Sequence, residues 1–452
     1  MALTLQILHA ADQEGGIEAL EDAPRFSSVL NALRSQFPDR TLTLTSGDLY
    51  IPGPFLAASS DDSLGDILGR EGPGRGDIVI NNALGFQAAT FGNHEFDLGT
   101  STVASLLETD GDYPGTAFPY LSANLDLSTD SNLAEFVVPD GGPPQPNSIA
   151  KSAVIEVQGQ PIGIVGATTP LLDSISSPGN VGVSPADPNN FDALAATIQP
   201  SVDALSARGI NKIILLSHMQ QISVEQELAP RLRDVDVIIA GGSNTLLADA
   251  TDRLRVGDAV EGPYPILQTS ASGEPVAIIN TDGNYKYVGR LVADFDENGV
   301  LIPGSIDPNV SGAYATDETG VIQTGNVPAD PKVVEVIGGL QGVIATKDGN
   351  TFGRSEVFLN GDRGDTRTQE TNLGNLTADA NLFAARQVDP SVAIAIKNGG
   401  ASVPRWGPSV PPAALTPQWG KKHHREQIRL PARKLGKCPN SILKMPCDST
   451  TS

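Results

Sequence analysis

The chain is short of cysteine and histidine, and the few it has are unevenly placed. Only two of its 452 residues are cysteines, Cys438 and Cys447, and both lie near the end of the chain. The body before residue 401 therefore has no thiol, which excludes disulfides and thiolate metal sites there. The same body holds three histidines, His9, His94 and His218. Because imidazole is so scarce, the surroundings of each histidine are informative.

Positive charge and long apolar runs are also in short supply. The chain has 30 Lys and Arg against 53 Asp and Glu, and a net charge of −23. This balance argues against a nucleic-acid polymer or an anionic membrane surface as partner, because both need a Lys/Arg footprint. No apolar run approaches the ~18 residues of a membrane span. The opening MALTLQILHA lacks the basic region and cleavage site of a signal peptide, so we expect that signal to be absent from this chain.

The last segment, residues 401–452, differs from the body. It carries nine Lys and Arg against two Asp and Glu, a net charge of +7, so the body stands near −30. It also contains both tryptophans and both cysteines. Such a break in residue usage marks a foreign basic tail, which we expect to be disordered.

Apolar runs that end in polar residues recur along the body and alternate with amphipathic stretches. The runs include TLQILHAAD, RTLTLTSGD, FQAATFGNHE, INKIILLSHM and VDVIIAGGSN. Residues 17–37 and 190–209 have apolar positions three and four apart, as helices do. This alternation predicts an α/β fold. In α/β sheets, ligands bind at the carboxyl ends of the strands, where these polar residues lie.

Composition also suggests a domain boundary. In residues 285–302 apolar and polar residues alternate, and Asn298-Gly299 is typical of a hairpin turn. We take this hairpin as the edge of a first domain over 1–302. The Pro/Asp/Gly-rich stretch 303–330 is predicted to be a linker. A second, partial α/β domain is expected over 331–400.

The strand ends supply the donors that a pair of divalent ions needs. Such a pair requires a shared carboxylate with flanking oxygen or imidazole ligands. Asp48 is the candidate for the shared position. The other candidate ligands are Asp12, Glu14, Asn93, His218 and Asn244. His94 follows Asn93 and has Asp97 three residues on, close enough to orient its ring.

With these motifs the chain resembles the calcineurin-like metallophosphoesterases, specifically the 5'-nucleotidase branch. GNHEFD is the most specific signature, and LHAAD, SGD, LLSHM and IIAGG occur in the family's order. The resemblance covers roughly residues 3–400. It implies a four-layer αββα sandwich, two divalent ions bridged by Asp48, and a water that attacks phosphorus. It also implies that His94 and Asp97 form the catalytic dyad, that Asn93 and His94 contact substrate, and that the protein is periplasmic or extracellular.

Two metal positions depart from the family pattern. Glu14 stands where the family usually has histidine, and Gly242-Ser243-Asn244 replaces H-x-H or H-x-Q. A first site of Asp12, Glu14, Asp48 and Asn244 is all oxygen, which favours Ca²⁺, Mg²⁺ or Mn²⁺. The second site keeps Asp48, Asn93 and His218, is suited to Zn²⁺ or Mn²⁺, and lacks a protein ligand at Gly242. Water or substrate is expected to fill that position.

The second domain is expected to be incomplete. By the resemblance, Arg363 and Arg367 match arginines that grip the substrate. The family then continues with N-G-G-G-x-R, where this chain reads NGGASVPRWG. ASVPRWG can be encoded by a set of codons that, read after one restored base, encodes Gly-Ile-Arg-Ala-Ser-Met-Gly. We therefore hypothesise that the chain after Gly400 is truncated or out of frame.

The expected function is hydrolysis of small phosphate monoesters, nucleotides included, by a metal-activated water. Within enzymes, a phosphodiesterase or a broad alkaline phosphatase remains open as an alternative. A catalytically silent metal-binding module is the alternative from another class. Individual residues also have simpler readings: Asp12 and Asp48 as helix caps, His218 as a core histidine, Glu14 as a first-turn charge and Asn244 as a turn residue.

Overall fold

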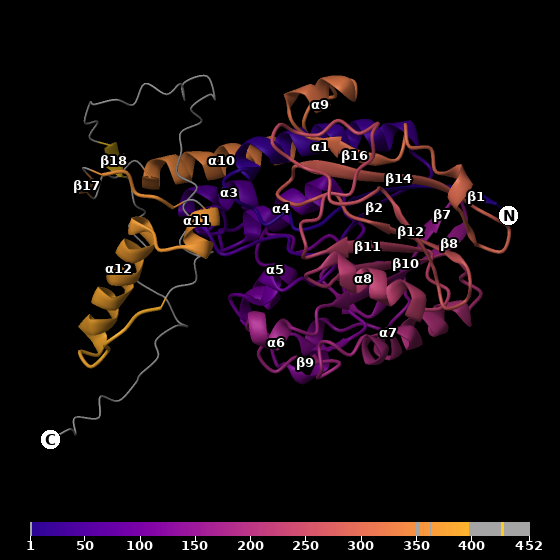
Figure 1. Cartoon of the computed structure of the whole chain (residues 1–452), viewed down its shortest axis with the longest axis horizontal. Helices are drawn as coiled ribbons and strands as arrows, with labels where there is room; N and C mark the ends of the chain where they lie inside the picture. The colour runs from indigo at the N-terminus through magenta and orange to yellow at the C-terminus, as the bar shows by residue number, and fades with distance from the viewer. Residues whose placement is uncertain (1, 349–352, 356, 362, 397–425, 429–452) are drawn as a thin grey trace. The chain divides into compact units, whose positions relative to one another are not determined.

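The computed structural model describes residues 2–348, 353–355, 357–361, 363–396 and 426–428. By its internal contacts the chain divides into two compact units, Met1–Val343 and Ile344–Ser452. Figure 1 labels the helices and strands of both. Within the described residues no helix is long and apolar enough to cross a membrane.

Two sheets form the centre of the first unit. The first sheet has the order β15-β14-β1-β2-β3-β4-β6, with β16 also paired to β14, and the second has the order β12-β13-β11-β10-β8-β7. The first comprises β1 (Leu3–Ala10), β2 (Thr41–Thr45), β3 (Ala88–Thr90), β4 (Tyr120–Leu121), β6 (Ile149–Ala150), β14 (Tyr287–Phe295), β15 (Leu301–Ile302) and β16 (Gly312–Ala315). The second comprises β7 (Ser152–Val157), β8 (Gln160–Thr168), β10 (Ile213–His218), β11 (Val237–Gly241), β12 (Ile266–Thr269) and β13 (Pro275–Ile279).

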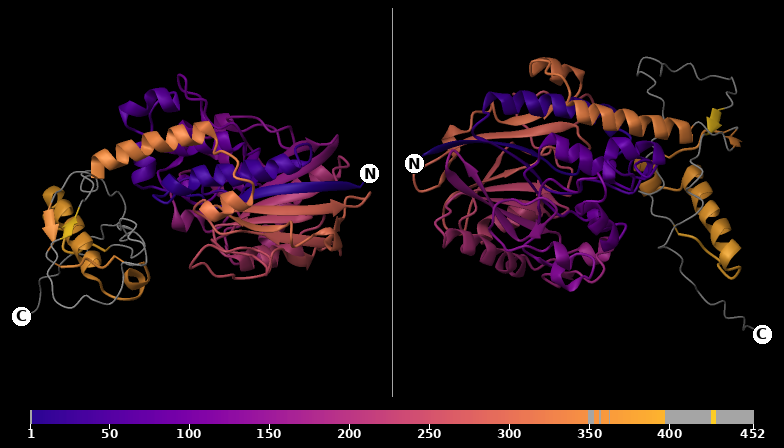
Figure 2. Two further views of the ribbon diagram at one scale, coloured as in Figure 1. Left: turned by 90° about the horizontal axis from the view of Figure 1, so that it is seen from above. Right: turned by 180° about the vertical axis from the view of Figure 1, so that it is seen from behind.

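Helices cover the outer faces of both sheets. On the first sheet, α1 contacts β1 and β14, and Gln6 of β1 donates to the Leu33 carbonyl of α1. On the second, α7 contributes Leu194 and Ile198 to a core with Leu215 of β10. Figures 1 and 2 show α1 and α7 on opposite sides of the two sheets. The longer helices that lie wholly in this unit are α1 (Ala19–Gln36), α4 (Arg75–Leu84), α5 (Thr100–Leu107), α7 (Phe191–Ser206) and α8 (Ile222–Leu228).

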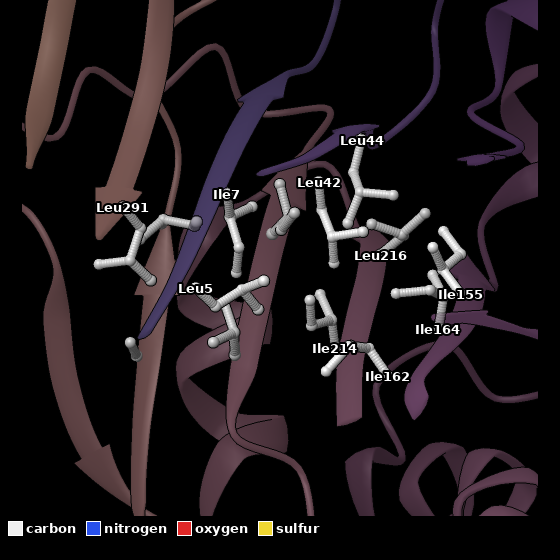
Figure 3. Packing of buried hydrophobic residues seen from close by; sticks show 14 of the residues in the cluster. Leu5, Ile7, Leu42, Leu44, Ile155, Ile162, Ile164, Ile214, Leu216 and Leu291 are labelled. Atoms are coloured by element: carbon white, nitrogen blue, oxygen red, sulfur yellow. The ribbon is translucent and has the colours of Figure 1, made fainter. Parts of the chain in front are cut away.

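The space between the sheets is filled by aliphatic side chains. Alternate residues of β1 point into it, because successive side chains of a strand face opposite sides. Leu5 and Ile7 thus belong to one buried cluster with Ile214 and Leu216 of β10, as Figure 3 shows. This arrangement of helix, sheet, sheet and helix confirms the predicted α/β sandwich.

The predicted linker is wrong. Residues 303–330 contain strand β16 and helix α9 (Glu318–Gln323), and β16 pairs antiparallel with β14. The Pro, Asp and Gly residues of this stretch are typical of a connection, but the outer edge of β14 offers unpaired backbone groups that a strand such as Gly312–Ala315 can satisfy. The hairpin of β14 and β15 is as expected, with its turn at Asn298-Gly299.

The second unit begins later than residue 331. Helix α10 (Pro331–Asp348) starts in the first unit, where Val333, Val336 and Leu340 are buried. The second unit's described elements are β17 (Gly353–Ser355), α11 (Arg363–Thr368), α12 (Asn372–Val388) and β18 (Glu426–Ile428). Most of the basic tail lies outside the described residues. The exception is β18, which pairs with β17 and departs from the expectation of a tail without regular structure.

Removing one side chain from the inter-sheet core should destabilise the first unit. Leu216 is completely buried, so Leu216→Ala should lower the free energy of unfolding by about 2–5 kcal/mol through lost transfer energy and a cavity. Urea denaturation, monitored by far-UV circular dichroism, measures the change in unfolding free energy. The matched variant Leu267→Ala, at a side chain that is 49% exposed, should change stability little. Equal losses in the two variants would contradict the assigned core.

Candidate metal centre

The candidate ligands gather at one edge of the sandwich. Asp12, Asp48 and Asn93 follow the parallel strands β1, β2 and β3, while His218 ends β10 and Asn244 follows the parallel β11. Carboxyl ends of parallel strands share an edge of their sheet. Residues from five separate stretches of sequence are therefore brought to one place.

Asp48 lies at the centre of the group. Ligand atoms of Asp12, Asp48 and His218 are within 4.8 Å of one another, and so are those of Glu14, Asp48 and His94. His218 Nε2 is 3.1 Å from Asp48 Oδ2 and 4.0 Å from Asp12 Oδ1. Asp48 thus belongs to both groups, which is the property required of a carboxylate shared by two cations.

Two asparagines add neutral oxygens beside these groups. Asn93 Oδ1 is 3.3 Å from His218 Nε2. Asn244 Oδ1 is buried and lacks a hydrogen-bond partner in the described part of the chain. A Cβ atom placed on Gly283 would lie 2.6 Å from that oxygen and 2.9 Å from Asp12 Cβ, so the oxygen lies beside Asp12. An orphaned acceptor next to buried carboxylates fits a divalent cation, which supplies the missing partner.

The backbone is strained at most of these positions. Asp12, Glu14, Asp48 and Asn244 have φ between 50° and 55°, in the left-handed region that L-residues seldom adopt. Each such residue costs about 1–3 kcal/mol and persists only where its surroundings enforce it. Strain on this scale is common at functional sites and is unexplained by helix capping.

Hydrogen bonds between the two sheets hold the edge together. Ser46 Oγ, after β2, donates to the Ile239 carbonyl of β11 at 2.6 Å. His218 Nδ1 donates to the Ser46 carbonyl at 2.6 Å, which leaves Nε2 directed at Asp48. The backbone N–H of Gly242 donates to both carboxylate oxygens of Asp12, at 2.8 and 3.0 Å. The fold therefore fixes His218 and Asp12 before any ligand arrives.

Several ionisable side chains are buried close together at this centre. Burial raises the pKa of Asp12 to about 8. Burial would lower the pKa of His218, but Asp48 and Asp12 outweigh it and raise that pKa to about 10. Burial also opposes ionisation of Asp48, yet the neighbouring His218 and His94 bring its pKa below the ordinary value. Without other cations, the carboxylates thus depend on protonated imidazoles for compensation.

His94 and Asp97 form a dyad at the open side of the centre. His94 Nδ1 is 2.6 Å from Asp97 Oδ2, and Ser176 Oγ donates to Asp97 Oδ1 at 2.8 Å. Both oxygens of Asp97 are thereby engaged, so the imidazole is oriented with Nε2 free of that contact. The His94 side chain is 26% exposed, whereas that of His218 is fully buried. Of the two histidines, His94 is the one that solvent can reach.

Comparisons with known proteins find nucleotide phosphoesterases and 5'-nucleotidases. No family model matches the chain. The chain is 27% identical over 410 residues to the trifunctional nucleotide phosphoesterase YfkN of Bacillus subtilis, covering 88% of this chain and 24% of that protein. It is 29% identical over 302 residues to the 5'-nucleotidase of Diplobatis ommata, covering 66% of this chain and 45% of that one. The chain thus spans less than half the length of both.

A solved structure extends the likeness to three dimensions. The 5'-nucleotidase precursor of Thermus thermophilus superposes with a TM-score of 0.64 at 26% identity, over 85% of this chain and 68% of that one. In sequence and in fold the chain is thus similar to proteins of the 5'-nucleotidase branch, as the motifs predict.

One buried residue at this centre does not follow from the pattern of strand ends. Glu95 is completely buried, and its carboxylate accepts the backbone N–H groups of Asp48 (3.1 Å), Leu49 (2.8 Å) and Gly92 (2.7 Å). It therefore ties the loop that carries Asp48 to the loop that carries His94. Its position between His94 and Phe96 in the signature was the only available signal, because its partners are backbone groups.

The two candidate arginines lie in the second unit. Arg363 and Arg367 both fall in α11, but their side chains lie outside the described residues. Their role in holding substrate stays a prediction.

Replacing Glu95 by glutamine should loosen the centre. Glu95→Gln turns one acceptor oxygen into a donor that faces backbone N–H groups, which should cost about 1–3 kcal/mol of unfolding free energy. Chemical denaturation of the wild-type and variant proteins measures this loss. The matched Glu108→Gln variant, at an exposed position, should be neutral. A neutral Glu95→Gln would show that the three contacts do not stabilise the centre.

Cation binding should strengthen as pH rises. A proton occupies Asp12 below about pH 8, and a cation needs that carboxylate charged. The apparent Kd for Mn²⁺ on chelator-stripped protein should therefore fall about tenfold per pH unit for each proton displaced, as pH approaches 8 from below. Isothermal titration calorimetry in buffers of different ionisation enthalpy gives both Kd and the protons released. A pH-independent Kd without proton release would contradict the prediction.

Proposed function

We propose that the chain hydrolyses phosphate monoesters and that nucleotides are its natural class of substrate. The observation that carries the proposal is the shared Asp48, which joins two ligand groups next to the His94–Asp97 dyad. The names of the similar proteins, a nucleotide phosphoesterase and 5'-nucleotidases, support the choice of substrate. An acidic protein needs local positive charge to accept such an anion. Cations held around Asp48 would supply that charge.

We infer two cation positions that share Asp48. Asp12, Glu14 and Asn244 would complete the first, and Asn93 and His218 the second. The first set is all oxygen and favours Ca²⁺, Mg²⁺ or Mn²⁺, whereas the imidazole of the second also suits Zn²⁺. Divalent ions at these positions supply Lewis-acid activation of water and neutralise charge on the phosphoryl oxygens.

His94 would act as the proton donor. Burial disfavours its charged form, but Asp48 and the hydrogen bond to Asp97 dominate and raise its pKa to about 9. Without bound cations, its ring is therefore protonated at neutral pH. Asp97 holds Nδ1, so Nε2 would deliver a proton to the leaving-group oxygen as the ester bond breaks. The partial exposure of His94 and Glu14 makes their side the approach for substrate.

The similar proteins also suggest where the chain acts and on what kind of substrate. We propose a location outside the cytoplasm, because one similar protein is the 5'-nucleotidase of Naja atra venom. We propose a small phosphate ester as the partner. The residues that would select the base belong to the expected second domain.

Loss of His94 should remove most activity while leaving cations bound. For His94→Ala, kcat on p-nitrophenyl phosphate should fall about 10²- to 10⁴-fold, the usual contribution of a general acid. Elemental analysis of the same sample should still find the wild-type metal content. Ser176→Ala should lower kcat several-fold, because Asp97 loses a hydrogen bond that constrains it. Ser174→Ala is the matched control and should leave kcat unchanged, because its hydroxyl donates to the nearby Leu171 carbonyl.

The alternatives are separated by the same assay. Faster hydrolysis of bis-p-nitrophenyl phosphate than of the monoester would favour a phosphodiesterase. Two bound ions with turnover of neither ester would favour a silent metal-binding module. Chelator-insensitive activity would contradict the proposed function altogether.

A further inference from the structure

Gly242 leaves a gap in the ligand set of the second cation position, and a neighbouring side chain lies in that gap. A Cβ atom built on Gly242 would lie 2.8 Å from Gln220 Nε2, 2.8 Å from Gln220 N and 2.9 Å from His218 Nε2. A Cβ atom does not approach non-bonded atoms so closely, so a side chain at residue 242 would displace Gln220. The room left by the glycine is therefore room that the Gln220 carboxamide uses.

The same carboxamide contacts a candidate ligand. Gln220 Nε2 donates to Asn93 Oδ1 at 2.5 Å, and Asn93 Oδ1 is 3.3 Å from His218 Nε2. The head of Gln220 thus meets the group formed by Asn93, His218 and Asp48. A carboxamide exchanges its oxygen and nitrogen by a half-turn, so Gln220 can offer Oε1 to a cation from the same place.

The backbone conformation of Gln220 indicates that its surroundings hold the side chain in this place. Its φ is 71°, in the left-handed region that Asp12, Glu14, Asp48 and Asn244 also occupy. Asparagine and aspartate tolerate this conformation better than glutamine does, so local sequence preference does not account for it. Strain of about 1–3 kcal/mol is retained two residues after His218, where it turns the side chain back toward Asn93.

We propose that Gln220 is a ligand of the second divalent ion and replaces the side chain that Gly242 lacks. This inference rests on the proposed function, because it assumes the second cation position. The position would then have one carboxylate, two carboxamides and one imidazole, from Asp48, Asn93, Gln220 and His218. A donor set of mostly hard oxygens favours Mn²⁺ or Mg²⁺ over Zn²⁺. Gln220 thereby takes the place that was assigned to water or substrate.

Three variants of the full chain test the proposal through metal binding. Gln220→Met keeps the length of the side chain but has no oxygen, Gln220→Glu keeps an oxygen, and Gln221→Ala removes the exposed neighbouring carboxamide. The readouts are Mn²⁺ stoichiometry and Kd by calorimetry, and the electron paramagnetic resonance signal of a coupled Mn²⁺ pair. Circular dichroism verifies that each variant is folded.

Wild type, Gln220→Glu and Gln221→Ala should bind two ions. Gln220→Met should bind the second ion at least about tenfold more weakly, the scale of losing one ligand interaction, and lose the coupled signal. Should Gln220→Met fail to fold, Gln220→Ala takes its place with the same expectation. Two ions bound with unchanged Kd in the oxygen-free variant would overturn the role of Gln220 alone. Fewer than two ions in the wild type would overturn the proposed function as well.

Discussion

The structure depends on the compensation of negative charge buried at one edge of a two-sheet sandwich. Asp12, Asp48 and Glu95 are each at most 2% exposed, and Glu14 lies next to them. Carboxylates this close repel one another, and a low-dielectric surrounding strengthens the repulsion. Backbone N–H groups and two imidazoles supply part of the compensation. Divalent cations would supply the rest, which links the folding of this edge to the chemistry proposed for it.

The inter-sheet core and this polar edge serve different purposes. The aliphatic side chains between the sheets stabilise the sandwich by burial, and they end where the strands end. Beyond that point the chain turns in strained, left-handed conformations that only a well-fixed scaffold can hold. The hydrogen bonds from Ser46 to β11 and from Gly242 to Asp12 connect the two sheets there. A stable core thus supports a centre whose backbone conformations are themselves destabilising.

Much of this could be predicted from the sequence, because strand ends and signature residues follow simple rules. Apolar runs that end in Asp12, Asp48, Asn93 and His218 were sufficient to predict that these residues meet. Glu95 and Gln220 could not be found in that way. Glu95 acts on backbone N–H groups, which every residue has, and the position of Gln220 depends on the absence of a side chain at Gly242.

The domain boundary was harder to predict for a related reason. Residues 303–330 are rich in Pro, Asp and Gly, which is typical of a linker, yet their segment Gly312–Ala315 pairs with the edge of β14. Pairing of this kind depends on a partner that is distant in the sequence. By contrast, the amphipathic stretches at 17–37 and 190–209 were predicted well as α1 and α7, because helical periodicity is local.

The central claim is that two cations share Asp48. Anomalous diffraction from crystals soaked in Mn²⁺ tests it most directly, because each ion gives its own peak. We expect two peaks beside the Asp48 carboxylate, one toward Asp12 and Asn244 and the other toward Asn93 and His218. A single peak, or peaks away from Asp48, would contradict it.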